Sequence, residues 1–422
     1  MKIAVIGGGS TYTPELVDGF IARAKKLGLT ELALMDIDEE RLSVVGTFAQ
    51  RMVEHAGRPF RVSLTTDRRA ALDGAAFVST QFRVGKQPAR YQDELLGLRH
   101  GLIGQETTGI GGMAKALRTL PVIFSICEDM DRYCPNAWLI NFTNPSGLVT
   151  EAILNFAGRE KAVGLCNVPI DMKMTVAKHL RVPDEAVDMD VIGLNHLGWV
   201  RRVTVNGEDV TARLLHYLAS EEGPKNIPDV DFKPELIEAL QAVPLYYNRY
   251  YYNTERVLAL LQAKPKTRAQ EVMAVEETLL AKYRDPDLFT KPEELNLRGG
   301  AYYSKIAIDV IDALVNDLGI VHAVNVRNQG AIPGLPDRFV VETNCTIGRD
   351  GARPRSAGEP DESMLALLFQ AKMYEILTIK AALHRSYAYA LKAIFTNPLG
   401  PTADRAKPIL DDMIAVNRLD LK

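Results

Sequence analysis

Short apolar runs alternate with longer amphipathic stretches through the first half of the chain. Runs of apolar and β-branched residues indicate buried strands, and apolar residues that recur every three or four positions indicate helices. The predicted strands cover residues 2–6, 31–36, 60–64, 75–80, 136–140 and 161–165. The predicted helices cover residues 14–27, 38–56, 113–132, 145–157 and 169–180. This alternation predicts an α/β fold built on a Rossmann-like, doubly wound parallel sheet.

The pattern changes beyond residue 197. The predicted helices there cover residues 233–262, 266–284, 300–317 and 360–394, with strand-like pieces at 321–326 and 338–346. We therefore predict a nucleotide-binding domain over residues 1–197 and a mixed, mainly helical α+β domain over residues 198–422. Residues 80–112 are rich in Gly and polar side chains, which favours a long loop of the kind kept for a function.

The composition excludes several classes of protein. The chain has 422 residues, with 50 Lys and Arg against 53 Asp and Glu and a formal net charge of −3. It lacks the basic block that nucleic acid binding needs, and no apolar run approaches the roughly 18 residues of a membrane span. Four Cys without a CxxC pair favour reduced thiols in a cytoplasmic protein. The N-terminal MKIAVIGGGS predicts a first core strand and not a signal peptide.

The turn after the first predicted strand has the features of a dinucleotide site. Two glycines fit the G-x-G-x-x-G pattern, but Tyr12 stands where the third glycine is usual. Asp36 ends the second strand, where a carboxylate accepts ribose hydroxyls and favours NAD over NADP. The predicted cofactor-binding residues are Gly7, Gly9, Ser10, Thr11 and Asp36. The alternative is a glycine turn that binds no ligand.

Two side chains with metal-ligand chemistry each follow a predicted strand: Cys166 in GLCNVP and His196 in GLNHLGW. Because carboxyl ends of parallel strands face the ligand crevice, the two could meet beside a nicotinamide. Taken singly, Cys166 is better explained as a buried structural thiol and His196 as a packed imidazole. The motif LINFTNPSG places Asn144 at another strand end, where it could instead cap a helix. The segment PLYYNRYYYNTE supplies candidate tyrosine bases, although packing explains most of its Tyr residues.

Together these motifs resemble the NAD- and metal-dependent family 4 glycoside hydrolases, and most closely the 6-phospho-β-glucosidases of that family. The resemblance covers nearly the whole chain. It rests on IAVIGGGSTYTPEL, DIDEER, QFRVG, GLIGQETTGIGG, NFTNPSG, GLCNVP, GLNHLGW, RGGAYYS and KMYEILTIKAAL.

The resemblance implies roles for individual residues. Cys166 and His196 would bind a divalent cation, usually manganese in the family, although thiolate and imidazole suit zinc or iron equally well. The family's catalytic base matches Tyr247, with Tyr246 as the neighbouring alternative. Glu106 corresponds to the acid that raises the basicity of that Tyr. The positions that contact substrate in the family match Arg90, Asn144 and Arg268.

The resemblance also implies a mechanism of oxidation followed by elimination. Hydride passes from C3 of the sugar to NAD, the metal polarises the resulting ketone, and Tyr247 removes the C2 proton. The glycosidic oxygen then leaves C1, water adds, and NADH returns its hydride. In the family, Asp after the ligand Cys is typical of α-linked substrates and Asn of β-linked ones. Asn167 therefore favours a 6-phospho-β-glucosidase, with Arg90 and then Arg298 as candidates to bind the phosphate.

Other functions remain open on the sequence alone. They are a 6-phospho-α-glucosidase or α-galactosidase of the same family, an NAD-dependent hydroxy-acid dehydrogenase, and a non-enzymatic nucleotide sensor. A dehydrogenase would release NADH, and a sensor would have no use for Cys166, His196 and a base together. We expect a phosphorylated glycoside as the partner, with no nucleic acid and no membrane. By the resemblance we also expect a homodimer or homotetramer.

Overall fold

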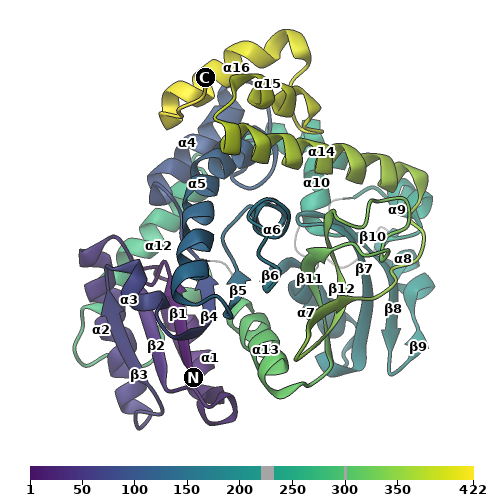
Figure 1. The fold of residues 1–422 in the computed structure, drawn as a ribbon. Helices are drawn as coiled ribbons and strands as arrows, with labels where there is room; N and C mark the ends of the chain where they lie inside the picture. Colours follow the sequence, from purple (N-terminus) through teal and green to yellow (C-terminus); the bar gives the residue numbers. More distant parts are fainter. Residues whose placement is uncertain (220–231, 299–301) are drawn as a thin grey trace.

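The computed structural model describes residues 1–219, 232–298 and 302–422 and confirms the Rossmann-like core (Figure 1). Six parallel strands stand in the order β3-β2-β1-β4-β5-β6, which is the arrangement of doubly wound dinucleotide-binding sheets. Their bounds are β1 (Lys2–Ile6), β2 (Glu31–Met35), β3 (Arg61–Thr65), β4 (Ala75–Thr80), β5 (Trp138–Asn141) and β6 (Ala162–Gly164). Because all six run in one direction, the segments that follow them gather at one edge of the sheet.

Helices cover both faces of this sheet, since its strands carry apolar side chains on both sides. On one face, Ile3 and Val5 of β1 pack against α1 (Thr13–Leu27), α2 (Glu39–His55) and α13 (Tyr303–Asn316). On the other face, Ala4 and Ile6 pack toward α3 (Arg68–Leu72), α5 (Gly109–Tyr133) and α6 (Ser146–Asn155). Burial on both faces explains why the strands are near-continuous apolar runs.

Later segments of the chain extend the same sheet. Three antiparallel strands continue it beyond β6, in the order β6-β11-β12-β13. Their bounds are β11 (Ile320–Arg327), β12 (Val340–Gly348) and β13 (Gly351–Pro354). The strands predicted at 321–326 and 338–346 are therefore present, and they complete the sheet that begins at β1.

A smaller antiparallel sheet is built on a hairpin. The hairpin pairs β7 (Val187–Leu194) with β8 (Leu197–Val205). β9 (Glu208–Asp209) and β10 (Val243–Pro244) add to β8. The boundary predicted at residue 197 falls within this hairpin, while β11 to β13 return to the first sheet. The division into residues 1–197 and 198–422 stays a prediction.

The second half contains shorter helices than the sequence pattern predicted. The single helix predicted over 233–262 is wrong, because Pro244 belongs to β10 and the chain re-forms helix only after it. The helix predicted over 360–394 is divided at Arg385, which has a φ of 51°. The predicted start of α13 at residue 300 lies outside the described residues. The remaining helices are α7 (Val168–Leu180), η1 (Asp184–Ala186), α8 (Thr211–Ala219), α9 (Pro234–Leu240), η2 (Tyr246–Asn248), α10 (Arg249–Tyr252), α11 (Thr254–Ala263), α12 (Arg268–Tyr283), η3 (Glu293–Arg298), α14 (Glu362–His384), α15 (Tyr387–Thr396) and α16 (Ala403–Asn417).

Half of the loop predicted over 80–112 is a helix, α4 (Lys86–Arg99). Its buried face is mostly polar, so the apolar periodicity of an amphipathic helix is weak. Asp93, which is fully buried, pairs with Arg118 of α5, and Glu94 accepts the backbone N–H of Ala269 at 2.9 Å. The loop prediction is wrong for α4 because ion pairs and hydrogen bonds hold much of its inner face, with Leu96 as its fully buried apolar side chain.

Within the described part of the chain, α5 is the one helix long and apolar enough to cross a membrane by length and composition. Most of its apolar window, 72%, is buried inside the fold, where Ile123, Ile126 and Met130 pack against the parallel sheet. A core helix passes the same test, so this feature is weak evidence for a membrane span.

Candidate active site

A large cavity of about 1150 Å³ opens at the carboxyl edge of the parallel strands. Its walls come from the glycine turn after β1, the segments after β2, β4 and β5, and the tyrosine-rich segment around η2. Every site residue predicted from the sequence lines this cavity except Thr11 and Cys166, which are fully buried behind its wall. Segments far apart in the sequence therefore meet in one place.

The glycine turn is held by the carboxylate at the end of β2. Asp36 accepts the backbone N–H of Gly9 at 2.9 Å through Oδ2 and that of Asp38 at 3.1 Å through Oδ1. A side chain at residue 9 would bring its Cβ to 2.9 Å from the same Oδ2. Gly7 has a φ of 97°, which a residue with a side chain rarely adopts. Asp36 therefore shapes the turn and also faces the cavity.

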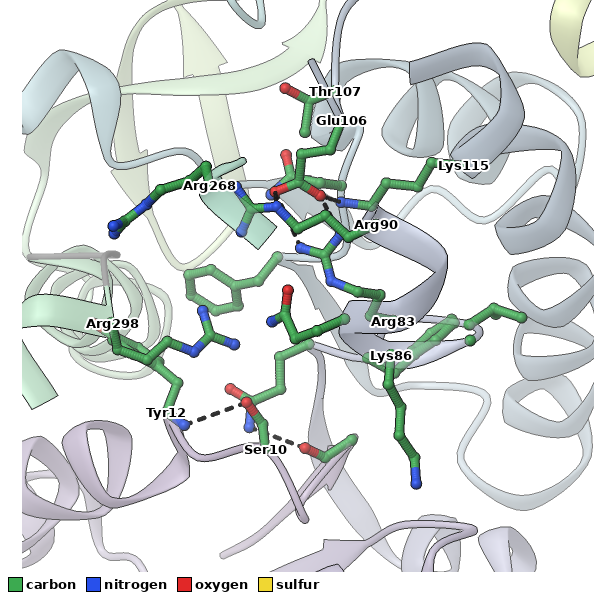
Figure 2. A pocket seen from close by; sticks show the side chains of 18 of the residues that line it. Ser10, Tyr12, Arg83, Lys86, Arg90, Glu106, Thr107, Lys115, Arg268 and Arg298 are labelled. Atoms are coloured by element: carbon green, nitrogen blue, oxygen red, sulfur yellow. Dashed lines mark hydrogen bonds and ion pairs between the residues drawn. The ribbon is translucent and has the colours of Figure 1, made fainter. Parts of the chain in front are cut away.

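Arg298 lies near this turn, as Figure 2 shows, and is linked to it through Glu276 of α12. Oε1 of Glu276 is 3.3 Å from Nη2 of Arg298 and accepts the Thr11 hydroxyl at 3.2 Å. Arg41 of α2 donates to the other oxygen of Glu276, also at 3.2 Å. No sequence motif indicated Glu276 as a site residue. The two glycines after Arg298 in RGGAYYS lie outside the described residues.

Three cations converge on Glu106 at the other end of the cavity (Figure 2). Arg83 makes two contacts with its carboxylate, Lys115 lies 2.7 Å from Oε2, and Arg90 lies 3.4 Å from Oε1. Burial alone would raise the pKa of Glu106, but these three charges outweigh it and hold the pKa well below its usual range. Burial, and then Arg83, lower the pKa of Lys115 to about 7. Neither Arg83 nor Lys115 was predicted as a site residue.

The predicted metal ligands are in contact. Cys166 follows β6, and His196 stands in the turn between β7 and β8 with a φ of 65°. Sγ of Cys166 lies 3.5 Å from Nε2 of His196. Ligand bonds of about 2.3 Å from sulfur and about 2.1 Å from nitrogen, at a near-tetrahedral angle, place two ligand atoms about 3.6 Å apart. The spacing therefore fits two ligands of one transition-metal ion.

The protonation states of the pair agree with this reading. Burial, with a smaller effect from Lys115, lowers the pKa of His196 to about 3, so the imidazole is neutral and can act as a ligand. Burial, and then Glu342, raise the pKa of the Cys166 thiol, so the thiolate needs a cation to form. Within the described part of the chain, no group of three or more His, Cys, Asp or Glu side chains could hold a metal. A metal on this pair would therefore keep coordination positions for other ligands.

Tyr247 stacks on the imidazole of His196, with ring centroids 3.9 Å apart and an interplanar angle of 7°. Tyr246 also lines the cavity, so geometry leaves both phenols near the metal ligands. Burial, and then the neighbouring Tyr250, raise the pKa of Tyr247, while Arg90 acts in the opposite direction. A phenolate at Tyr247 therefore requires cationic charge beside it.

The remaining predicted residues line the cavity between these centres. Oδ1 of Asn144 accepts the backbone N–H of Ser146 at 3.3 Å, which gives it a structural contact at the start of α6. Asn167 stands at the start of α7, next to Cys166. Arg268 lies on the rim, half exposed, where it pairs with Glu271 at 3.0 Å. The partly buried Tyr303 of α13, which was not predicted as a site residue, also faces this space and hydrogen-bonds to Asn144.

Fold and site together define a Rossmann-like protein whose nucleotide-type turn shares one cavity with an imidazole and a phenol, and the imidazole is in contact with a buried thiol. The family model described as "Family 4 glycosyl hydrolase" matches residues 2–182, and the model of the C-terminal domain of that family matches residues 191–400. The chain belongs to glycosyl hydrolase family 4.

Individual relatives agree with this assignment. The chain is 42% identical to the 6-phospho-β-glucosidase of Escherichia coli, over 98% of this chain and 94% of that protein. It superposes with a TM-score of 0.92 on the 6-phospho-β-glucosidase of Thermotoga maritima solved with manganese, NAD+ and glucose-6-phosphate, at 38% identity over 100% of both chains. A 6-phospho-α-glucosidase from gut microorganisms, solved with NAD and Mn2+, is 30% identical with a TM-score of 0.89, over 100% of this chain and 99% of that one.

Proposed function

We propose that this protein hydrolyses 6-phospho-β-glucosides with the help of NAD and a divalent cation, in the first place manganese. The observation that carries the proposal is the contact between Cys166 and His196 beside Tyr247, in a cavity whose opposite end is a dinucleotide-type turn. The relatives support the choice of chemistry, since the structures described above contain NAD together with manganese. The higher identity to named 6-phospho-β-glucosidases supports the β linkage.

The cofactor would lie on the turn after β1. Backbone N–H groups at the start of α1 suit a pyrophosphate, and Asp36 suits a ribose hydroxyl. The residues proposed for this role are Gly7, Gly9, Ser10, Thr11 and Asp36. When bound, NAD accepts and returns a hydride, and the cation held by Cys166 and His196 acts as a Lewis acid on a carbonyl oxygen.

Tyr247 would remove the proton from C2 of a sugar that is a ketone at C3. Such a proton is far more acidic than an ordinary sugar C–H, so a phenolate is a sufficient base. Arg90 supplies positive charge that favours the phenolate. Glu106 would act through Arg90 and its two further cations, since its carboxylate is already engaged by all three.

Substrate recognition falls to the polar side chains between the two ends of the cavity. We assign this role to Arg90, Asn144, Arg268 and Arg298. Three cations around Glu106 leave an excess of positive charge there, which suits a phosphorylated sugar. Asn167 cannot donate a catalytic proton, so the leaving group of a β-glycoside would take its proton from another acid or from water.

The test is a turnover assay with an aryl 6-phospho-β-glucoside. We expect release of the aryl alcohol only with NAD, Mn2+ and a thiol reductant present together, and no accumulation of NADH. Stoichiometric NADH would instead favour the hydroxy-acid dehydrogenase. Cleavage of the 6-phospho-α-glucoside alone would move the assignment to the α enzymes of the family. We also propose a cytoplasmic homodimer or homotetramer, which size-exclusion chromatography with light scattering tests.

A further inference from the structure

A buried carboxyl group on β12 joins the two segments that carry the proposed metal ligands. Glu342 is 1% exposed and lies directly opposite Asn325 in the antiparallel pair of β12 with β11. Its Oε1 accepts the side-chain N–H of Asn325 at 2.9 Å and that of Asn195 at 3.2 Å. One oxygen atom of Glu342 thus accepts hydrogen bonds from side-chain amides in two different parts of the fold.

Asn325 connects Glu342 to the strand before Cys166. It pairs across the sheet with Gly164, the last residue of β6, and its side chain donates to the Gly164 carbonyl at 3.3 Å. A side chain at residue 164 would bring its Cβ to 2.9 Å from the Cβ of Asn325. The close approach of β6 and β11 therefore fixes the point from which the chain continues to Cys166.

Asn195 connects Glu342 to the turn that carries His196. It precedes His196 directly, and its side chain accepts the backbone N–H of Gly147 at 3.2 Å and hydrogen-bonds to the sulfur of Cys166. His196 itself has a left-handed backbone, a conformation that a residue with a side chain keeps only when its surroundings hold it. The orientation of the Asn195 side-chain amide therefore affects the positions of both Cys166 and His196.

We propose that Glu342 is a positioning residue that sets the geometry of the Cys166–His196 pair through Asn195 and Asn325. The inference rests on the proposed metal-binding role of that pair. Partners of metal ligands commonly change metal affinity without touching the metal. Asn344 of β12 also contacts the β7–β8 hairpin, but farther from the tip that carries His196. It accepts the backbone N–H of Val191 at 3.0 Å and donates to the carbonyl of Met189 at 2.8 Å.

The experiment compares Mn2+ dissociation constants of the full-length, NAD-free protein, measured by electron paramagnetic resonance of the free ion. Glu342→Leu leaves the amide donors of Asn325 and Asn195 without their acceptor, and we expect its dissociation constant to rise by about tenfold to a hundredfold. Glu342→Gln keeps an acceptor oxygen in the same place and should stay within about threefold of the wild type. Asn344→Ala is the matched control, which should lower the melting temperature and leave the constant unchanged.

Asn195→Ala is the second variant, for the case in which Glu342→Leu does not fold. This substitution removes the hydrogen bond between Asn195 and Glu342 from its less buried partner, and we expect a comparable loss of Mn2+ affinity. Wild-type affinity in either folded variant overturns the positioning role. A loss in Glu342→Gln as large as in Glu342→Leu also overturns it, since hydrogen bonding would then not be the cause. If the wild type binds no Mn2+ at all, the proposed metal site itself fails, and this inference fails with it.

Discussion

Sγ of Cys166 lies 3.5 Å from Nε2 of His196, although the two residues are 30 positions apart and follow strands of different sheets. Cys166 continues from the last parallel strand of the Rossmann-like sheet, and His196 caps the hairpin of the smaller sheet. The two sheets therefore meet at this contact. The stacked ring of Tyr247 lies against the same imidazole.

The first prediction concerns metal binding by this pair. Cys166→Ser and His196→Ala should each weaken Mn2+ binding by at least about a hundredfold, because a site with two protein ligands loses one of them. Isothermal titration calorimetry on the NAD-free protein measures this. Cys127→Ser is the matched control, since Cys127 is an equally buried thiol in the α5 core. Equal Mn2+ affinity in Cys166→Ser would show that the thiol is no ligand.

The second prediction separates two adjacent phenols. Tyr247→Phe should abolish the exchange of the substrate C2 proton with deuterated solvent, because the phenol that stacks on His196 is the proposed base. Tyr246→Phe should retain the exchange, and it is the matched control because its ring also lines the cavity. Mass spectrometry of recovered substrate measures both. Exchange that persists in Tyr247→Phe and stops in Tyr246→Phe would move the base by one position.

Local pattern was sufficient to predict the parallel sheet and the segments that form the site. Apolar runs predicted the strands, and residues that follow such runs, among them Asp36 and Cys166, come to the same edge of the sheet by topology. A local pattern fails to predict an element that is held by polar contacts with residues far along the chain. α4 was predicted as a loop because its inner face is held by Asp93 and Glu94.

The same limit explains which site residues the sequence did not reveal. Arg83 stands at a strand end within QFRVG, and that position was an available signal. Lys115 is a single Lys in an apolar helix, and its partner Glu106 lies in the loop just before that helix, a pairing that helical spacing does not indicate. Glu276 and Glu342 act through partners far along the chain, so spacing gives no indication of either.

The third prediction concerns Asp36. Asp36→Ala removes the acceptor of the Gly9 N–H and the proposed ribose contact, so NAD should bind about tenfold more weakly or worse. Fluorescence titration with NADH measures the dissociation constant. Asp38→Ala is the control: it removes the N-cap of α2, at a cost of about 1 kcal/mol in stability, and leaves the Gly9 contact in place. An unchanged constant in Asp36→Ala would remove its ribose role.

The last prediction concerns the pH dependence of stability. Burial raises the pKa of Glu342 from 4.5 to about 7, with partial opposition from the hydrogen bonds of Asn325 and Asn195. Between these values the folded protein keeps a proton that the unfolded chain has lost, so this contribution to stability decreases as the pH rises. Above pH 7 the full difference between the two pKa values applies, and it lowers the free energy of unfolding by about 3 kcal/mol.

Glu342→Gln cannot titrate and should escape this loss. Urea unfolding without metal should therefore give similar stabilities for variant and wild type at about pH 3.5, where the acid is largely neutral in both states. The variant should become the more stable of the two as the pH approaches about 8, by an amount on the order of 3 kcal/mol. A stability difference that does not change with pH would mean that Glu342 ionises in the folded protein as readily as in the unfolded chain.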